Sequence, residues 1–253
     1  ETNYRELKQK FLEEGSGNWV LMPPVTFNPY ENNAQDDIFR PSAPSIENGH
    51  YLGTDTTSRD ILSRLIYGTR IALWFALAFT LSVYLIGIVI GCAMGYFGGI
   101  FDLLFQRFIE IWSNIPFLYM VIIVFSVVPS GLPSSARITI LLSVMVLFSW
   151  TSITYYMRTE TYREKSRDYV SAARIMGAST WRIIFKHILP NAMSTLITFV
   201  PFTVIAAITA ITALDFLGFG LPPPTPSLGE LLKQGTSSLR TAPWIVISAF
   251  GTL

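Results

Sequence analysis

The sequence predicts an all-α protein, a polytopic bundle of transmembrane helices with a polar segment outside the membrane. Hydrophobic residues make up 51% of the 253 positions and charged residues only 14%, whereas soluble domains carry about 25% charged residues. The charges are also segregated, because 17 of the 35 Asp, Glu, Lys and Arg residues lie in residues 1–70 and 10 more lie in residues 158–186. The stretches between them are long and apolar, as membrane-crossing helices require.

Residues 1–70 form the polar segment, with ten acidic and seven basic residues and no apolar run long enough to cross a bilayer. At its end, Ile61, Leu62, Leu65 and Ile66 share one face at helical spacing. We expect a helix here that lies at the outer membrane interface. It could anchor the chain in the membrane, or it could contact a docked protein.

The predicted spans follow from length, since a helix needs about 20 apolar residues to cross the hydrocarbon. They are residues 71–96, 100–128, 138–157, 192–214 and, truncated by the end of the chain, 244–253. Pro116 and Pro201 fall inside two of these spans, where we expect them to kink the helix.

The loop of residues 158–190 sets the orientation, because Lys and Arg collect in cytoplasmic loops. It carries seven basic and three acidic residues, so we place it inside. By parity, residues 1–70 and the loop of residues 215–243 are outside. A polar segment is exported only behind a signal or an earlier span, so we expect at least one span before residue 1 and a continuation after residue 253.

The inside loop contains a pattern of two short amphipathic helices joined at a glycine. Asp168 is expected to cap the first helix, Gly177 to end it and Ser179 to cap the second. The expected apolar faces are Tyr169, Ala172, Ala173 and Met176 in the first helix, and Trp181, Ile184, Phe185 and Ile188 in the second. Residues 168–190, called the knob below, either insert into a partner protein or lie on anionic lipid.

The knob resembles the "EAA" loop of bacterial ATP-binding-cassette (ABC) importer permeases. The resemblance rests on the run Tyr169-Val170-Ser171-Ala172-Ala173-Arg174-Ile175-Met176-Gly177 and on His187-Ile188-Leu189-Pro190-Asn191-Ala192 nine residues later. Ser171 stands where that motif has Glu, and His187 where Ile is usual. The resemblance implies a coupling loop for an ATPase subunit, with the coupling residues Asp168, Tyr169, Val170, Ala172, Ala173, Arg174, Gly177, Leu189 and Pro190.

Two outer stretches, residues 51–70 and 214–232, resemble the dipeptide/oligopeptide/nickel branch of that family, and most of all the Yej-type importers of peptides and microcin C. Three successive prolines at 222–224 cannot continue a helix, so a new short helix is expected from about Ser227. The resemblance implies contacts with an external binding protein, for which the candidates are Asp55, Arg59, Asp60, Pro223 and Ser227.

The predicted span 100–128 carries a polar stripe that begins at Asp102 and continues through Gln106, Glu110, Ser113 and Asn114. These last four could line a translocation path, since ionisable groups in a membrane usually face water or a partner. They could equally make a helix–helix contact in which Arg107 pairs with Glu110. Threonines of the predicted span 192–214 (Thr195, Thr198, Thr203, Thr209 and Thr212) could line a path, or they could bond their own backbone or neighbouring helices.

Catalytic and metal sites are not expected in this chain. It has no phosphate-binding G-x-x-x-x-G-K-[ST] loop and no H-E-x-x-H pair. Its two histidines, His50 and His187, fall on opposite sides of the membrane in the predicted topology, and its one cysteine, Cys92, lies within a span. We therefore expect no cofactor in this chain and no nucleic-acid partner.

The resemblance implies a multi-pass permease subunit of the type I ABC importer kind in the bacterial inner membrane. Its implied partners are membrane lipid, a second permease forming a heterodimer, cytoplasmic ABC ATPase subunits that bind ATP and Mg, and an extracytoplasmic peptide-binding protein. The alternatives are an ATP-independent secondary transporter or channel subunit, which needs ionisable groups at mid-membrane in several spans, and a membrane-anchored structural subunit.

Overall fold

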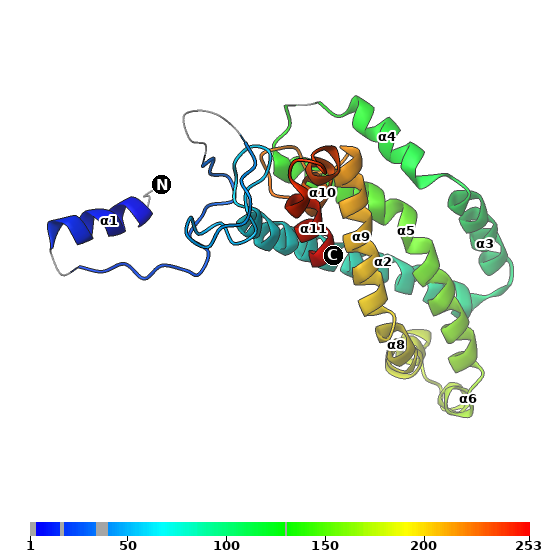
Figure 1. Cartoon of the computed structure of the whole chain (residues 1–253). Helices are drawn as coiled ribbons and strands as arrows, with labels where there is room; N and C mark the ends of the chain where they lie inside the picture. Colours follow the sequence, from blue (N-terminus) through cyan, green and yellow to red (C-terminus); the bar gives the residue numbers. More distant parts are fainter. Residues whose placement is uncertain (1–3, 16–17, 34–39, 130) are drawn as a thin grey trace. The chain divides into compact units, whose positions relative to one another are not determined.

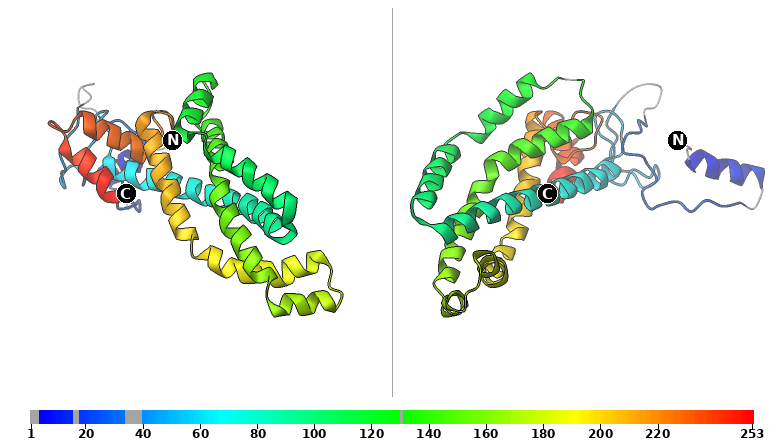
Figure 2. Two further views of the ribbon diagram at one scale, coloured as in Figure 1. Left: turned by 90° about the vertical axis from the view of Figure 1, so that its right-hand side faces the viewer. Right: turned by 180° about the vertical axis from the view of Figure 1, so that it is seen from behind.

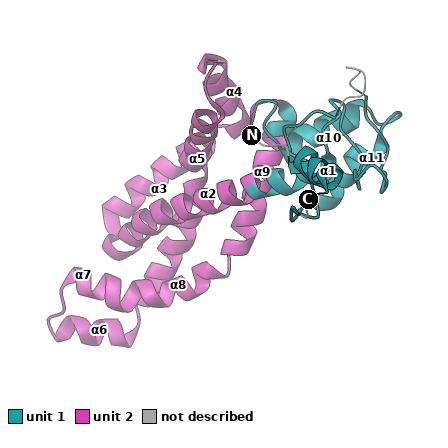
Figure 3. Ribbon diagram, turned by 90° about the vertical axis from the view of Figure 1, so that its left-hand side faces the viewer, with its two compact units in different colours: residues 1–70, 215–217, 222–253 teal, residues 71–214, 218–221 magenta. Residues whose placement is uncertain are grey.

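The computed structural model describes residues 4–15, 18–33, 40–129 and 131–253. Regular structure in these residues is helical, apart from the isolated bridges Ser45–His50 and Thr54–Asp60 (Figure 1). The predicted all-α class is therefore confirmed. The chain forms two compact units, unit 1 with residues 1–70, 215–217 and 222–253, and unit 2 with residues 71–214 and 218–221 (Figure 3).

Two helices, α2 (Ile61–Phe97) and α9 (Val200–Leu217), contain residues of both units. The other helices of unit 1 are α1 (Tyr4–Glu14), α10 (Leu228–Ser237) and α11 (Pro243–Thr252). Those of unit 2 are α3 (Gly99–Ser113), α4 (Phe117–Val127), α5 (Ser134–Lys165), α6 (Asp168–Ile175), α7 (Thr180–Ile183), the π-helical turn η1 (Ile184–Ile188) and α8 (Leu189–Ile197).

Among the described residues, three helices are long and apolar enough to cross a membrane: α2, α5 and α9. Helices α3 and α4 together give a fourth candidate, broken at residues 114–116 and bent by 70° (Figure 2). The predicted spans 71–96 and 138–157 lie within α2 and α5. The predicted span 192–214 is divided between α8 and α9, so the chain breaks just before Pro201 and not at a kink within one helix.

Local hydrogen bonds terminate α3 at the break before α4. Pro116 has no N–H with which to continue α3. Instead, the Ile115 N–H donates to the Trp112 carbonyl at 3.2 Å, and the Asn114 side-chain Nδ2 donates to the Glu110 carbonyl at 2.7 Å. Unsatisfied backbone groups are expensive in hydrocarbon, and these bonds supply partners where the helix ends.

Helix α2 is one continuous helix of 37 residues, about 55 Å long at 1.5 Å per residue. The predicted helix near Ile61 is therefore the first part of α2 and continues without a break into the predicted span, and its position at the outer interface remains a prediction. The reason is local, since no proline or left-handed glycine interrupts the chain between Ile61 and Phe97.

Helix α2 packs on α5 through three glycines spaced four residues apart. A Cβ atom placed on Gly91 would lie 2.5 Å from the carbonyl oxygen of Thr154. One on Gly87 would lie 2.8 Å from the Ile153 Cβ, and one on Gly95 would lie 2.6 Å from the Thr161 Cβ. Small residues at this spacing allow two helix backbones to approach closely in a membrane.

The threonines of α8 and α9 bond mainly to their own backbone. The hydroxyl of Thr198 donates to the Thr195 carbonyl at 2.6 Å, that of Thr203 to Phe199 at 3.1 Å, and that of Thr209 to Ile205 at 2.9 Å. Thr203 also lies 3.4 Å from the Tyr84 hydroxyl of α2, so backbone bonding does not exclude a path role for it, and that role remains a prediction.

Helix α11 holds the predicted truncated span 244–253 and has ten residues, within unit 1. Its Val246 backbone nitrogen would lie 2.6 Å from a Cβ atom on Gly235 of α10. The two short helices therefore pack backbone against backbone, and the prediction that residues 244–253 begin a span remains a prediction.

Candidate functional site

The knob is a hairpin of α6 against the continuous run of α7, η1 and α8, and it extends away from the other helices of unit 2 (Figure 2). Helix α6 begins at Asp168 with Arg167 in the capping position, so the prediction that Asp168 is the cap is off by one residue. In the first turn, its negative charge still favours the positive end of the helix dipole.

The turn at the end of α6 has the geometry predicted for Gly177. Gly177 has φ of +80°, its N–H donates to the Arg174 carbonyl at 3.0 Å, and the Ala178 N–H donates to the Ala173 carbonyl at 3.0 Å. This pair of bonds is a Schellman motif, which ends a helix and fixes the exit direction of the chain. Ser179 then caps α7 by accepting from the Arg182 N–H at 3.4 Å, as predicted.

The face that the knob buries differs from the predicted one. Val170 and Ala173 are buried in α6, and Ile183, Ile184 and Ile188 are buried in the facing helix. Tyr169, Ala172 and Met176, which were predicted to share the apolar face with Ala173, are exposed. The helical spacing of the apolar residues was predicted correctly. The buried face of α6 is rotated from the predicted face by about one residue, because Val170 and Ala173 are the residues buried in the hairpin.

Part of the exposed surface of the knob is apolar. We call it the knob tip, and it consists of Ile175, Met176, Trp181 and Phe185, which are 87%, 80%, 70% and 58% exposed. The rings of Trp181 and Phe185 stack with centroids 5.5 Å apart. Large apolar side chains exposed together often mark a surface that another protein or a membrane covers.

Tyr169 lies where the knob joins α5. Its hydroxyl donates to a carboxylate oxygen of Glu164, the last buried residue of α5, and accepts from the Asn191 amide at 3.2 Å. Burial, helped by the hydrogen bond to Glu164, raises the pKa of Tyr169 to about 12. Of the remaining predicted coupling residues, Arg174 and Pro190 are exposed and Leu189 is half-buried.

Sequence reasoning missed a buried ion pair between α3 and α5. Arg158 donates to both carboxylate oxygens of Asp102, at 2.5 and 2.7 Å, and the Tyr162 hydroxyl donates to the same carboxylate at 2.8 Å. Asp102 was placed in the polar stripe, but its partners follow it by 56 and 60 residues and no local spacing rule indicates them. The pair ties α3 to the part of α5 nearest the knob.

The candidate path residues on α3 and at its end are exposed or half-buried. Glu110 forms the predicted ion pair with Arg107, at 2.6 Å, and both side chains are exposed. Gln106 is half-buried, and Ser113 and Asn114 are exposed.

A separate cavity of about 410 Å³ lies between α2, α4, α5 and α9. The candidate path residues of α3 and its end are not among the residues that line it. Its lining is mostly apolar, with hydroxyl groups from Ser149, Ser152, Tyr156 and Thr203. The path role of Gln106, Glu110, Ser113 and Asn114 remains a prediction.

Four of the five candidate contacts for a binding protein are buried within unit 1. Asp55, Arg59, Asp60 and Ser227 are each less than 5% exposed, so they have almost no surface to offer to a docked protein, and the prediction for these four is wrong. Only Pro223 is exposed, and its contact with a binding protein remains a prediction.

The buried residues instead form an ion network with Arg64 and Glu230. Asp55 accepts from the Arg59 Nε at 2.9 Å and lies 3.5 Å from the Arg64 Nε. Glu230 bonds to Arg59 at 3.1 Å and to Arg64. The fully buried Arg64 also donates to the carbonyls of Pro29 and Pro224, at 3.0 and 3.1 Å.

The neighbouring Asp60 is held by a second group of contacts. It lies 2.9 Å from His50 Nδ1 and accepts from the Ser63 N–H at 2.7 Å, while the His50 ring stacks on Phe27 at 4.0 Å. These contacts join the irregular chain before residue 61 to the start of α2 within unit 1.

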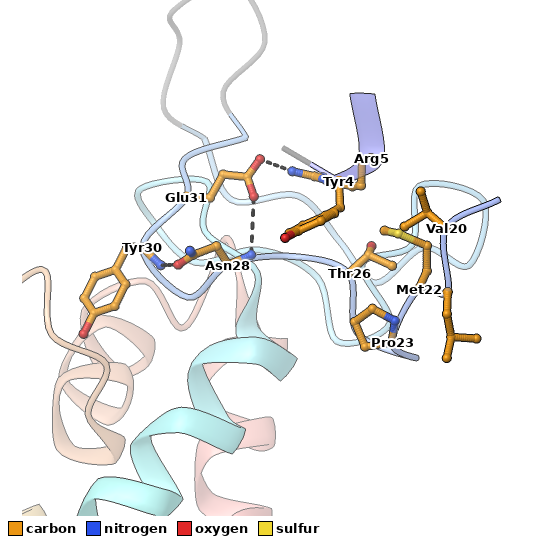
Figure 4. Close-up of a pocket in the computed structure, with 10 residues that line it drawn as sticks. Tyr4, Arg5, Val20, Met22, Pro23, Thr26, Asn28, Tyr30 and Glu31 are labelled. Carbon is orange, nitrogen blue, oxygen red and sulfur yellow. Dashed lines mark hydrogen bonds and ion pairs between the residues drawn. The ribbon is translucent and has the colours of Figure 1, made fainter. Parts of the chain in front are cut away.

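A further hollow of about 850 Å³ lies in unit 1 between α1 and the extended chain of residues 20–31 (Figure 4). Arg5 pairs with Glu31 across it, and the Asn28 N–H donates to the same carboxylate at 3.3 Å. Helix α1 contributes no buried residue. In the part of the chain that the structure describes, no group of three or more His, Cys, Asp and Glu residues could hold a metal ion.

Comparison with known proteins identifies the family. Residues 87–253 match the family described as "Binding-protein-dependent transport system inner membrane component". The chain is 44% identical to the inner membrane ABC transporter permease protein YejE of Escherichia coli, over 96% of this chain and 68% of that protein. It is 39% identical to the peptidoglycan transport system permease protein YejE of Agrobacterium fabrum, over 98% of this chain and 70% of that protein.

A third relative is the dipeptide transport system permease protein DppC of Haemophilus influenzae, which is 36% identical over 90% of this chain and 76% of its own length. Permeases of this family are membrane subunits that lack the ATPase site. With its apolar helices and its matched residues, the chain belongs to the binding-protein-dependent transport system inner membrane components, and is a multi-pass permease subunit of an ABC importer in the bacterial inner membrane.

Proposed function

We propose that this chain is one of two permease subunits of an ATP-driven peptide importer, and that its knob transmits the motion of a cytoplasmic ATPase to the spans. A second, similar permease completes the pathway, two ABC ATPase domains bind ATP and Mg, and an extracytoplasmic binding protein delivers the peptide. The observation that carries the proposal is the knob tip, an exposed apolar surface on a hairpin whose turn is fixed by Gly177.

The knob suits the transmission of force because both of its ends continue into long helices. Helix α5 leads into it and has 32 residues, and the run α7–η1–α8 leads out of it toward α9. An ATPase that closes on ATP can shift the permease only if it contacts the two permease states differently. The knob tip is where the described chain offers apolar area for such contacts.

The knob tip can be tested by comparing two exposed isoleucines, one in each unit. Ile175 is 87% exposed on the knob tip and Ile46 is 84% exposed in unit 1. Because a buried isoleucine contributes about 1.5–3 kcal/mol, Ile175→Glu should reduce co-purification of the ATPase about tenfold or more, while Ile46→Glu leaves it unchanged. Equal ATPase recovery from both variants would count against the knob tip as the docking surface.

Gly177 provides the second test, because a Cβ there meets no other atom within 4 Å and the only cost is its φ of +80°. A left-handed conformation costs an ordinary residue about 1–2 kcal/mol, whereas asparagine tolerates it. Gly177→Val should therefore change the turn and uncouple ATP hydrolysis from uptake, whereas Gly177→Asn should retain most coupling. The measurement is peptide uptake and ATP hydrolysis in the same proteoliposomes, and normal uptake by Gly177→Val would contradict the mechanism.

Peptides are the proposed substrate because the relatives carry peptide-related names, one for dipeptides and one for peptidoglycan, whose stems are peptides. Vesicles containing the full transporter should take up a labelled short peptide only with ATP and the binding protein. Excess unlabelled peptide should compete, and excess free amino acid should not. Competition by the amino acid alone would remove peptides as the substrate class.

A further inference from the structure

The junction between α5 and the knob is a polar cluster around one hydroxyl group. The Tyr169 cluster consists of Glu164, Tyr169, His187 and Asn191. Tyr169 comes from α6, Glu164 from α5, His187 from η1 and Asn191 from α8. The Tyr169 hydroxyl donates to Glu164, accepts from the Asn191 Nδ2 at 3.2 Å, and lies 3.5 Å from the His187 carbonyl oxygen. One side chain therefore contacts the end of the span and both arms of the hairpin.

The cluster has a physical origin in Pro190. Proline has no N–H and cannot donate to the carbonyl four residues before it, and the helix widens into the π turn η1 just before this position. The Asn191 Nδ2 donates to the His187 carbonyl at 2.6 Å, so a side chain bonds a carbonyl at the irregular turn. The same amide group then donates to Tyr169. Such π-helical turns are frequent at functional sites.

The charges around the cluster make Glu164 a strong acceptor. Its carboxylate is 7% exposed and lies 3.4 Å from the Arg163 Nε and 4.0 Å from the Arg167 Nε, while both arginines are more than half exposed. Hydrogen bonds to an ionised acceptor are shorter and roughly twice as strong as neutral ones. With its pKa at about 12, the Tyr169 hydroxyl keeps its proton at physiological pH and remains a donor.

We propose that Tyr169 is the positioning residue that holds the knob at a fixed angle to α5, so that the knob and the span move as one body. This inference rests on the proposed coupling function of the knob. The hydroxyl makes no contact with the ATPase in this proposal, and it acts through Glu164 and Asn191. Without it, the hairpin keeps its buried Val170 and Ala173 but loses the bonds that orient it on the helix that it should move.

The test is Tyr169→Phe in the complete transporter, reconstituted with its second permease, ATPases and binding protein. The variant removes one oxygen atom and leaves the ring in place. We expect normal assembly and ATP hydrolysis, with about tenfold more ATP hydrolysed per peptide imported, since a hydrogen bond to a charged group is a strong one. The matched control is Tyr119→Phe on α4, where the ring is 66% exposed, and its ratio of ATP to peptide should equal that of the unmodified protein.

A pair of variants at Glu164 separates positioning from general damage. In Glu164→Gln the amide oxygen still accepts from Tyr169, so the ratio of ATP to peptide should stay near that of the unmodified protein. In Glu164→Leu the carboxylate acceptor is lost and only the distant His187 carbonyl, at 3.5 Å, remains, so the ratio should rise as in Tyr169→Phe. If Tyr169→Phe assembles poorly, this pair decides the question.

An unchanged ratio in Tyr169→Phe, or equal ratios in Glu164→Gln and Glu164→Leu, would overturn the positioning role. These results are distinct from a failure of the proposed function, which would show as the absence of any ATPase from the unmodified complex.

Discussion

Gly91→Leu is expected to prevent the close packing of α2 on α5 and to remove most of the correctly assembled protein. An added Cβ would lie 2.5 Å from the Thr154 carbonyl oxygen and 2.8 Å from the Met157 Cβ. Neither atom belongs to a flexible side-chain end, so the two helices must separate. Overpacking a core costs about 1–3 kcal/mol even when the surroundings adjust, and here the obstacle is backbone.

The measurement is the thermal transition and the monodisperse yield of the detergent-solubilised complex, with a decrease of about 5 °C or more expected. Gly251→Leu is the matched control, because Gly251 also lies in an apolar helix and a Cβ there meets nothing within 4 Å. A transition temperature for Gly91→Leu equal to that of Gly251→Leu would show that the α2–α5 contact is not as close as described.

Arg64→Met should destabilise unit 1 by about 3–5 kcal/mol, which is the usual cost of removing one partner from a buried ion pair. The side chain of Arg64 is fully buried, and its loss leaves Glu230 with Arg59 as its remaining charged partner and leaves two carbonyls without their donor. Methionine fills much of the volume, so the expected loss comes mainly from the uncompensated polar groups.

The control is Arg107→Met, which removes an arginine whose side chain is 73% exposed and whose pair with Glu110 lies at the surface. Exposed pairs contribute about 0–1 kcal/mol, so this variant should unfold close to the unmodified protein in the same denaturant titration. Equal losses for the two arginines would contradict the structural role assigned to the buried network.

Features fixed by near neighbours in the sequence could be predicted well. Gly177, Ser179 and Ser227 each act within a few residues of their position, and the structure places the left-handed turn and both caps there. The long apolar helices that contain the predicted spans 71–96 and 138–157 follow from continuous apolar runs in the sequence. These features need no knowledge of which segments meet.

Long-range partners could not be predicted in this way. Arg59 and Arg64 precede Glu230 by 171 and 166 residues, and a sequence pattern gives no sign that they meet. Charged residues in a polar segment were therefore interpreted as surface groups available to a partner. Their burial depends on the pairing of two arginines with two carboxylates, which only the folded unit reveals.

The knob shows a different limit. An apolar stripe indicates that a helix face is covered, but it does not tell whether the cover is the same chain or another protein. Val170 and Ala173 are covered within the hairpin, whereas Met176 and Trp181 stay exposed. The predicted faces combined residues that the hairpin buries with residues that stay exposed, because both sets are apolar and both recur at helical spacing.

The broken span formed by α3 and α4 has a consequence for movement. Since the Ile115 N–H already bonds the Trp112 carbonyl, which Pro116 leaves without a helical donor, a change in the angle between α3 and α4 need not disrupt a regular helical ladder. Bending an unbroken helix such as α5 would require such bonds to open in hydrocarbon, where each unsatisfied group costs several kcal/mol. We therefore expect residues 114–116 to act as a joint at which α4 can change its angle, while α3 stays bonded to α5 through Asp102 and Arg158.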